Sequence, residues 1–210
     1  MRTIDAIMRL APVIPVLVID DVRHARPIAE ALVHGGLTVL EVTLRTPAAI
    51  EAIREMRNVA GACVGAGTVL NPTDLRRARD AGAQFIVSPG LTNALAQAAI
   101  AAEISFLPGV SNASDIMRGL DLGLTHFKFF PAVASGGVPA LKALSAPFPQ
   151  ARFCPTGGIN AQTAGDWLAL PQVLCVGGSW LVSHGPPDLP AIEQTARKAA
   201  QLSKATGMGG

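Results

Sequence analysis

The sequence predicts a single (β/α)8 barrel of the TIM type, preceded by a short N-terminal helix. Eight short apolar runs, rich in β-branched residues, alternate with longer helical patterns along the chain. The 210 residues show no break in composition and half of them are hydrophobic, so the chain can bury one large core. Eight strand–helix units in roughly two hundred residues lie at the compact end of the size range of this fold.

The expected elements are one short N-terminal helix followed by alternating strands and helices. Near the N-terminus, Arg2, Asp5 and Arg9 are interleaved with apolar residues, which indicates a short amphipathic helix rather than a signal peptide. The apolar runs that follow predict strands at 13–19, 39–44, 63–69, 85–88, 105–108, 126–130, 152–155 and 173–176. Helical patterns lie between them, at 22–34, 47–57, 72–81, 93–102 and 114–122, and several end at a glycine, as helices commonly do.

An open, doubly wound α/β sheet is the alternative fold. Such a sheet more often carries a glycine-rich fingerprint after its first strand, whereas the corresponding turn here reads Ile19-Asp20-Asp21-Val22. No low-complexity segment or linker interrupts the chain. Residues 1–210 are therefore expected to form one domain, with 203–210 as a loose tail.

Charge and hydropathy exclude several classes of partner. The formal net charge is +2, and the one tight basic cluster, Arg76, Arg77 and Arg79, shares a helical pattern with Asp74 and Asp80. This arrangement is typical of a solvated helix face, so no nucleic acid partner is expected. No apolar run reaches the ~20 residues that a membrane-spanning helix needs, so no membrane association is expected either.

The cysteines and histidines do not suggest a metal site. The three thiols lie far apart within apolar runs, which is typical of core residues in a reducing compartment and predicts a cytoplasmic protein: Cys63, Cys154 and Cys175. The four histidines have no close ligand spacing: His24, His34, His126 and His184. We therefore expect neither a metal nor a cofactor, and because the chain has no tyrosine, proton transfer falls to Glu41 or water.

The strand at 39–44 carries polar residues on one face. Side chains alternate along a strand, so Glu41, Thr43 and Arg45 should face the barrel interior while the aliphatic residues between them pack on the helices. The interior of such a barrel is a packed core, and paired ionisable groups in a core usually mark a functional site. The alternative is a network of Glu41 and Arg45 that satisfies itself and merely fills the barrel.

The aromatic strand at 126–130 contains Lys128, which the same alternation directs to the interior if Phe127 and Phe129 face the helices. Burying a lysine costs several kcal/mol unless it is paired or gives up its proton. A neutral amine attacks carbonyl groups, so one interpretation is a Schiff-base lysine. On these six residues alone, a lysine that reaches water from the strand end is at least as good an interpretation. His126 shares this face one repeat deeper and is expected to be a satisfied histidine at the barrel bottom.

Two glycine pairs follow the last two predicted strands, at Gly157 and Gly158 and at Gly177 and Gly178. Glycines let the backbone approach a ligand closely, and in this fold the loops after strands seven and eight are the recurrent phosphate site. The pairs together predict such a site. A third glycine-containing run, GAGTV at 65–69, lacks the lysine and spacing of a nucleotide-binding loop, so its small residues are expected to make room for a ligand, with Thr68 offering a hydroxyl.

Five motifs follow one another between about residues 12 and 182: EVTLRT at 41–46, GAGTV at 65–69, FKFFPA at 127–132, PTGGI at 155–159 and GGSWLV at 177–182. Together they closely resemble the 2-keto-3-deoxy-6-phosphogluconate (KDPG) aldolase family, which also cleaves 4-hydroxy-2-oxoglutarate (KHG). The resemblance implies a class I aldolase of the Entner–Doudoroff pathway. Such a carbon–carbon lyase produces pyruvate and glyceraldehyde 3-phosphate, needs no cofactor and is typically a homotrimer.

The resemblance also implies roles for individual residues. Lys128 would form the Schiff base and Glu41 would move protons through a water. The other implied residues would hold the substrate: Arg45 and Thr68 at the pyruvate carboxylate and keto group, Pro89, Phe130 and Thr156 around the pocket, and Gly157, Gly158, Gly178 and Ser179 at the phosphate. The family often has an acidic residue where this chain has Val133, a departure that bears on substrate preference rather than on imine chemistry.

Other functions remain open from the sequence. Within the class, the substrate could be the C4-epimeric phosphogalactonate or an unphosphorylated 2-keto-4-hydroxy acid. A metal-free phosphosugar isomerase or epimerase would need Glu41 as its base but not Lys128. A non-catalytic phosphoester-binding barrel would tolerate the loss of both residues while still binding its ligand.

Overall fold

The structure, a computed structural model, describes residues 2–183 and 185–202, so the expected tail at 203–210 lies outside the described residues. Helices and strands alternate along the chain. Their order is α1 (Ile4–Met8), β1 (Val13–Leu17), η1 (Val22–His24), α2 (Ala25–His34), β2 (Val39–Thr43), α3 (Ala49–Met56), β3 (Cys63–Gly67), α4 (Pro72–Asp80), β4 (Phe85–Val87), α5 (Asn93–Ala101), β5 (Ser105–Leu107), β6 (Gly109–Val110), α6 (Ala113–Asp121), β7 (His126–Phe129), α7 (Gly137–Ser145), β8 (Arg152–Pro155), α8 (Ala164–Leu168), β9 (Val176–Gly178) and α9 (Leu189–Ala200).

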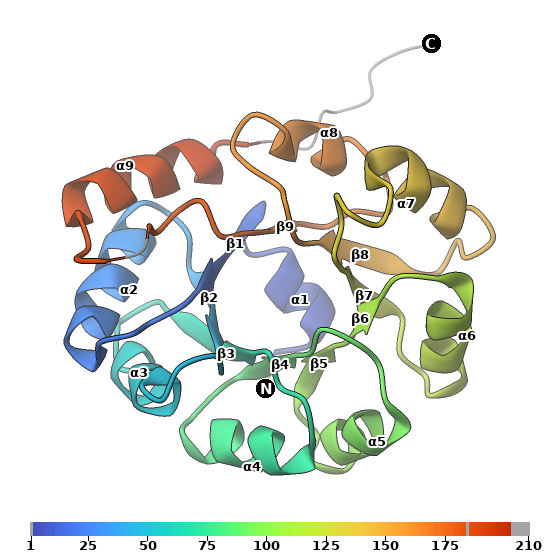
Figure 1. Ribbon diagram of the computed structural model, residues 1–210, viewed down its shortest axis with the longest axis horizontal. Coiled ribbons are helices and arrows are strands. Elements are labelled where there is room, and N and C mark those ends of the chain that lie inside the picture. Colours follow the sequence, from blue (N-terminus) through green and yellow to red (C-terminus); the bar gives the residue numbers. More distant parts are fainter. Residues whose placement is uncertain (1, 184, 203–210) are drawn as a thin grey trace.

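The strands pair in parallel and form two sheets. Six strands make a curled sheet in the order β5-β4-β3-β2-β1-β9, and three make a second sheet in the order β6-β7-β8. Two isolated bridges, Phe153 to Val173 and Thr156 to Gly177, connect the β8 segment with the β9 segment. Figure 1 shows the strands around a central space with the helices α2 to α9 outside them. Because paired strands are parallel, the loops that follow them gather at one end.

Five expected strands, at 13–19, 39–44, 63–69, 85–88 and 126–130, end one or two residues earlier than expected, and two others differ more. The strand expected at 105–108 ends as β5 at Leu107, and a further strand, β6, begins at Gly109. Pro108 between them has no N–H to donate to a ladder, although its carbonyl accepts from the Lys128 N–H at 2.8 Å. The last strand runs from Val176 to Gly178 rather than from Val173 to Val176, because the ladder with β1 pairs Val176, Gly177 and Gly178, whereas Val173 makes only an isolated bridge to Phe153. A strand ladder uses backbone groups, so side-chain hydropathy alone misplaced this strand.

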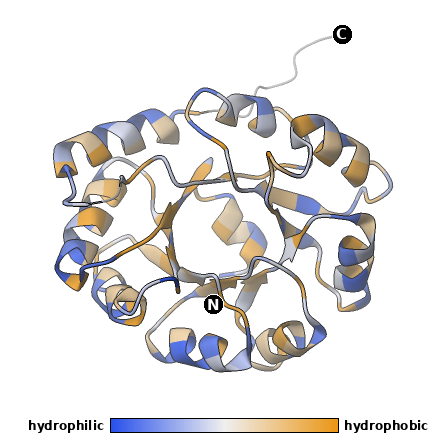
Figure 2. Cartoon of the chain, in the orientation of Figure 1, coloured by the Kyte–Doolittle hydropathy of each residue, from blue (hydrophilic) through white to orange (hydrophobic). Residues whose placement is uncertain are grey.

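The alternation of side chains in β2 and β7 is confirmed. Leu40 and Val42 of β2, and Phe127 and Phe129 of β7, belong to the large apolar cluster that contains the inner faces of the helices. Figure 2 shows these outer helices with both hydrophilic and hydrophobic residues, as expected for helices that cover a sheet on one side. Glu41 and Lys128, which alternate with these apolar residues of β2 and β7, therefore face the interior.

Helix α1 fills the amino end of the ring of strands, and Figure 1 shows it through that ring. The Thr3 hydroxyl caps it by accepting from the Ala6 N–H at 3.3 Å. Its buried residues Ile7 and Met8 pack in a second apolar cluster with interior strand residues such as Phe85. The short N-terminal helix expected from the sequence is therefore present, and its apolar side chains are part of the core.

His126 ties the first residue of β7 to this helix. Its Nε2 lies 3.0 Å from Asp5 Oδ1 and its Nδ1 lies 3.0 Å from the Thr125 hydroxyl, which confirms the expected satisfied histidine at the amino end. Arg9 Nε also donates to the Asp5 carboxylate, at 2.8 Å. The hydrogen bond from Arg9, together with that from His126, lowers the pKa of Asp5 from 3.8 to about 2.

We expect the Asp5 carboxylate to stabilise the fold above about pH 4 and to lose this effect as the pH falls toward 2, because the folded state binds the proton less readily than the unfolded state. Exposed ion pairs are worth less than about 1 kcal/mol, so Asp5→Asn should lower the thermal midpoint at pH 7 by roughly 1 to 3 °C. Thermal melts between pH 2 and 7 should show this difference vanish at the acidic end. A difference that persists at pH 2 would instead assign the effect to packing.

Candidate active site

The centre of the candidate site is an ion pair between β2 and β7. Lys128 Nζ lies 3.1 Å from Glu41 Oε1, although the two residues are 87 positions apart in the chain. Their side chains are only 7% and 4% exposed, respectively. The expected meeting of Glu41 and Lys128 in the interior is thus confirmed, and the carboxylate is close enough to accept and return the amine proton directly.

Such a buried pair is weak evidence for stability, because the cost of removing two charges from water offsets much of their attraction. Buried ionisable pairs are more often retained for chemistry. The surroundings of Lys128 support this interpretation, since Nζ lies 5.3 Å from the centre of the Phe130 ring and the adjacent residue on β8 is Cys154. Phe130 is half-buried, so it can form part of a pocket wall above the amine.

Thr43 shares the inner face of β2 and has a structural partner. Its hydroxyl donates to the Leu17 carbonyl at 2.8 Å, which joins the carboxyl ends of β1 and β2. Thr46, in the turn that follows, donates in the same way to the Ile19 carbonyl. These bonds fix the end of β2 and hence the backbone that carries Glu41.

Arg45 is not buried in the interior as the sequence predicted. Strand β2 ends at Thr43, and Arg45 lies exposed in the turn before α3. Side chains alternate between the two faces only within a strand, so the alternation seen in β2 does not predict the direction of Arg45. The guanidinium lies at the end of the ring where the other candidate residues gather, and its role as a carboxylate anchor remains a prediction.

Thr68, directly after β3, has a strained backbone. Its φ is 55°, in the left-handed region that β-branched residues rarely occupy, at a cost of roughly 1 to 2 kcal/mol. The side chain is half-buried. Strain of this kind gathers at ligand sites, which is consistent with the predicted role of the Thr68 hydroxyl.

The small residues of β3 make room for protein side chains rather than for a ligand. A Cβ at Gly65 would overlap the Phe85 ring, and a Cβ at Gly67 would overlap Glu41 Oε1. The expectation that this run makes room for a ligand is therefore wrong at Gly65 and Gly67, where Phe85 and Glu41 fill the space.

Pro89 lies exposed in the turn after β4. The Ser88 hydroxyl, in a buried residue that the sequence analysis did not single out, donates to the Gly90 carbonyl at 2.6 Å and holds this turn. On the other side, a Cβ at Gly109 would overlap the Pro89 carbonyl, so β6 and the turn are in close contact.

The loop after β8 contains the first glycine pair. Gly157 and Gly158 have φ of 105° and 78°, conformations that favour glycine. The N–H of Thr156 donates to the Phe129 carbonyl at 2.9 Å, and the N–H of Val133 donates to the Gly157 carbonyl at 3.1 Å. These bonds place the glycine pair beside the loop that follows Lys128, and Val133 lies half-exposed against Gly158.

The second glycine pair lies next to the first. The Thr156–Gly177 bridge joins the two segments, so the loops after β8 and β9 are neighbours, as expected for one anion site. Ser179 is exposed at this position. Gly178 is packed so closely against the Trp180 ring that any side chain there would collide with it. Within the described residues, the buried Trp180 Nε1 has no hydrogen-bond partner.

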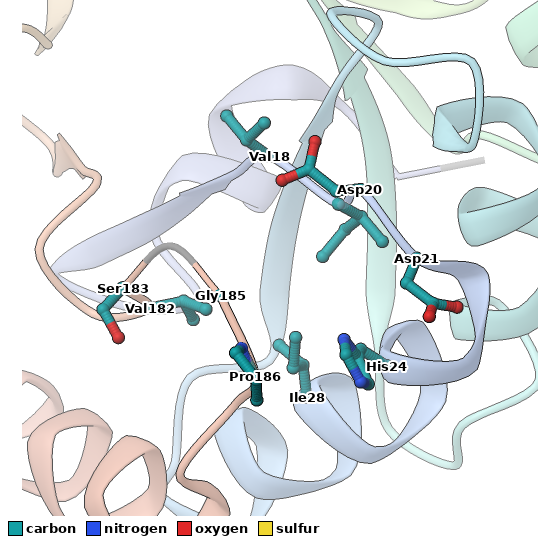
Figure 3. A pocket seen from close by; sticks show the side chains of 10 residues that line it. Val18, Asp20, Asp21, His24, Ile28, Val182, Ser183, Gly185 and Pro186 are labelled. Atoms are coloured by element: carbon teal, nitrogen blue, oxygen red, sulfur yellow. The ribbon is translucent and has the colours of Figure 1, made fainter.

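A separate cavity of about 230 Å³ lies between the loop after β1 and the loop after β9 (Figure 3). Asp21 and His24 line one side, and Val182, Ser183 and Pro186 line the other. None of the predicted site residues lines this cavity, so it is distinct from the site around Lys128.

Residues 2–183 and 185–202 contain neither a cluster of potential metal ligands nor a membrane-spanning helix. No group of three or more histidine, cysteine, aspartate or glutamate side chains is placed to hold a metal ion. No helix in this part of the chain has the length and apolar character needed to cross a membrane.

Comparisons with known proteins agree with this geometry. A family model described as KDPG and KHG aldolase matches residues 4–195. The 2-dehydro-3-deoxy-phosphogluconate aldolase of Zymomonas mobilis is 58% identical over 98% of this chain and 99% of its own. The crystal structure of the 2-keto-3-deoxy-6-phosphogluconate aldolase of Z. mobilis ZM4 with 3-phosphoglycerate superposes with a TM-score of 0.96, covering 98% of both chains at 58% identity.

A further solved structure has a covalent intermediate. The KDPG aldolase of Legionella pneumophila, with pyruvate captured at low pH as a covalent carbinolamine, is 46% identical. It covers 93% of this chain and 97% of its own with a TM-score of 0.89. In that protein, therefore, pyruvate forms the adduct that precedes a Schiff base.

Proposed function

Because this chain belongs to the KDPG and KHG aldolase family, we propose that it cleaves KDPG to pyruvate and glyceraldehyde 3-phosphate through a Schiff base on Lys128. The observation that carries the proposal is the buried Lys128–Glu41 pair at 3.1 Å. An isomerase would need only the acid, whereas this geometry supplies an amine and a proton carrier together. Pyruvate release from KDPG, measured beside release from its C4 epimer, tests the activity and the stereochemical preference.

The reaction begins when Lys128, after giving its proton to Glu41, attacks the C2 carbonyl of the substrate. The nitrogen then loses a proton and the former carbonyl oxygen gains one, which gives the carbinolamine. A second proton on this oxygen lets it leave as water and converts the carbinolamine to an iminium ion. Removal of the C4 hydroxyl proton then breaks the C3–C4 bond, and the electron pair moves into the iminium to give an enamine and the free aldehyde. Protonation of the enamine at C3 and hydrolysis of the imine release pyruvate and regenerate Lys128.

Glu41 is the proposed acid and base in these steps, directly or through a water. Arg45 is proposed to bind the substrate carboxylate with two parallel hydrogen bonds, and Thr68 to bind the same end of the substrate. Pro89, Phe130 and Thr156 would form the pocket wall. KHG, which shares the pyruvate end, is the proposed second substrate.

The proposed phosphate site consists of Gly157, Gly158, Gly178 and Ser179. Backbone N–H groups in glycine-rich loops bind anions well because no side chain blocks their approach. The adjacency of the two loops through the Thr156–Gly177 bridge supports this assignment. Substitution of Gly178 would be a poor test, since the new side chain would displace the Trp180 ring as well as any phosphate.

Ser179→Ala is the sharper test. Loss of one hydrogen bond to a charged group costs roughly 1.5 to 3 kcal/mol, so kcat/KM for KDPG should fall by about 10- to 150-fold. Cleavage of KHG, which has no phosphate, should change by less than about threefold. Steady-state kinetics on both substrates decide the matter. Equal losses on both would remove Ser179 from the phosphate site.

We also propose that the nine strand segments act as the eight strands of a closed barrel, with β5 and β6 as one strand interrupted at Pro108. The bridges between the β8 and β9 segments support closure. From the sequence and the family resemblance we further propose one domain over residues 1–210, a homotrimeric assembly and a cytoplasmic location. Analytical ultracentrifugation tests the assembly.

A further inference from the structure

Gly67, the last residue of β3, lies against the carboxylate of Glu41. A Cβ built on Gly67 would overlap Glu41 Oε1 and would lie 2.7 Å from its Cγ and 2.8 Å from its Cδ. Real Cβ atoms essentially never approach other heavy atoms within 3.0 Å. The Glu41 side chain therefore occupies the space that any other residue at position 67 would fill.

The backbone does not require glycine at this position. The φ of Gly67 lies outside the left-handed region, so alanine could adopt the same backbone conformation. The left-handed residue is the next one, Thr68, which has a branched side chain. The chain thus has a glycine where the conformation is ordinary and a threonine where it is strained. What position 67 needs is the absence of a side chain.

We propose that Gly67 is a positioning residue for the aldolase reaction. Its missing side chain lets the Glu41 side chain lie against the end of β3, with Oε1 3.1 Å from Lys128 Nζ. The inference rests on the proposed function, because it assumes that Glu41 transfers protons at Lys128. In this proposal a residue of β3, Gly67, determines the position of Glu41, which belongs to β2.

The carboxylate has little freedom to avoid an added methyl group. Glu41 is 3% exposed, and its strand is held on one side by the β3 pairing and on the other by the Thr43 bond to Leu17. A side chain at position 67 would push the carboxylate away from β3 and change its distance from Lys128. Misplacement of a catalytic group by about 1 Å can lower the rate by roughly a hundredfold.

Gly65 offers a matched control on the same strand and the same face. A Cβ there would overlap the Phe85 ring rather than Glu41, one repeat deeper in the interior. Gly65→Ala therefore adds the same methyl group with a comparable clash, but against an apolar neighbour. The two substitutions separate a general packing defect from a specific effect on the carboxylate.

In steady-state kinetics on KDPG, Gly67→Ala should lower kcat by about 10- to 100-fold and change KM by less than about threefold. In a Glu41→Gln background the same substitution should lower kcat by less than about threefold, because the acid is already lost and its position no longer matters. Gly65→Ala should have the same effect on kcat in both backgrounds. A Gly67→Ala enzyme with wild-type kcat, or a loss that persists undiminished beside Glu41→Gln, would overturn the proposal.

Denaturant unfolding provides a readout that does not depend on catalysis. Gly67→Ala should destabilise the protein when Glu41 is present but not in a Glu41→Ala background, where the clashing side chain has been removed. Equal destabilisation in both backgrounds would also overturn the proposal. Failure of the roles proposed for Glu41 and Lys128 would look different, since Glu41→Gln alone would then retain activity or pyruvate would label a lysine other than Lys128.

Discussion

Lys128→Arg is expected to abolish KDPG cleavage, with kcat falling below the detection limit of a coupled assay for pyruvate. Arginine keeps the positive charge beside Glu41 but does not lose its proton in proteins, so it cannot attack a carbonyl. The loss should appear with KDPG and KHG alike, because both reactions pass through the same imine. Circular dichroism should show a folded protein, since the charge pair with Glu41 is retained.

Borohydride reduction in the presence of pyruvate tests directly whether Lys128 forms the imine. The reduced adduct should form on the wild-type protein and map to Lys128 by peptide mass analysis. Lys142→Arg, at an exposed position on α7, is the matched control and should be labelled and active as the wild type is. Pyruvate on another lysine, or turnover by the Lys128→Arg variant, would refute the Schiff-base assignment.

Glu41→Gln is expected to lower kcat by roughly 10²- to 10⁴-fold, the usual range for loss of a general acid or base. The amide keeps the shape of the side chain and can still accept a hydrogen bond from Lys128, but it cannot accept the amine proton. Pyruvate trapping by borohydride should remain possible but become slow. Single-turnover measurements on the wild type and the Glu41→Gln variant would separate imine formation from carbon–carbon cleavage.

The matched control is Glu51→Gln, at an exposed position on α3, which should leave kcat unchanged. If Glu41→Gln raised KM while kcat stayed at the wild-type value, Glu41 would be a binding residue and proton transfer would have to depend on water alone.

The sequence was sufficient where a strand carries clear alternation. In β2 and β7 the aliphatic and aromatic residues identified the outer face, and this correctly brought Glu41 and Lys128 into the interior. The same rule failed at Arg45, because a strand end is set by backbone pairing and not by hydropathy. The placement of β9 failed for a related reason, since Gly177 and Gly178 add no hydrophobic signal yet continue the ladder with β1.

Other features could not be read from the sequence because they depend on contacts between distant segments. The left-handed φ of Thr68 contradicts the ordinary preference of a β-branched residue, so no local rule would have predicted it. The glycine at position 67 suggested open space, but only the structure shows that Glu41 fills it. Sequence spacing indicates which residues share a face, whereas the distance of 3.1 Å between two charges follows from packing.

Helix α1 has a consequence for the order in which products leave. Its side chains Ile7 and Met8 fill the amino end of the ring, so substrate must arrive, and both products must depart, at the end where Thr68 and the glycine loops lie. In the proposed mechanism the three-carbon acid is still bonded to Lys128 after cleavage, whereas the phosphorylated aldehyde is no longer covalently attached. Glyceraldehyde 3-phosphate should therefore dissociate first and pyruvate second, and in the direction of synthesis pyruvate should bind before the aldehyde.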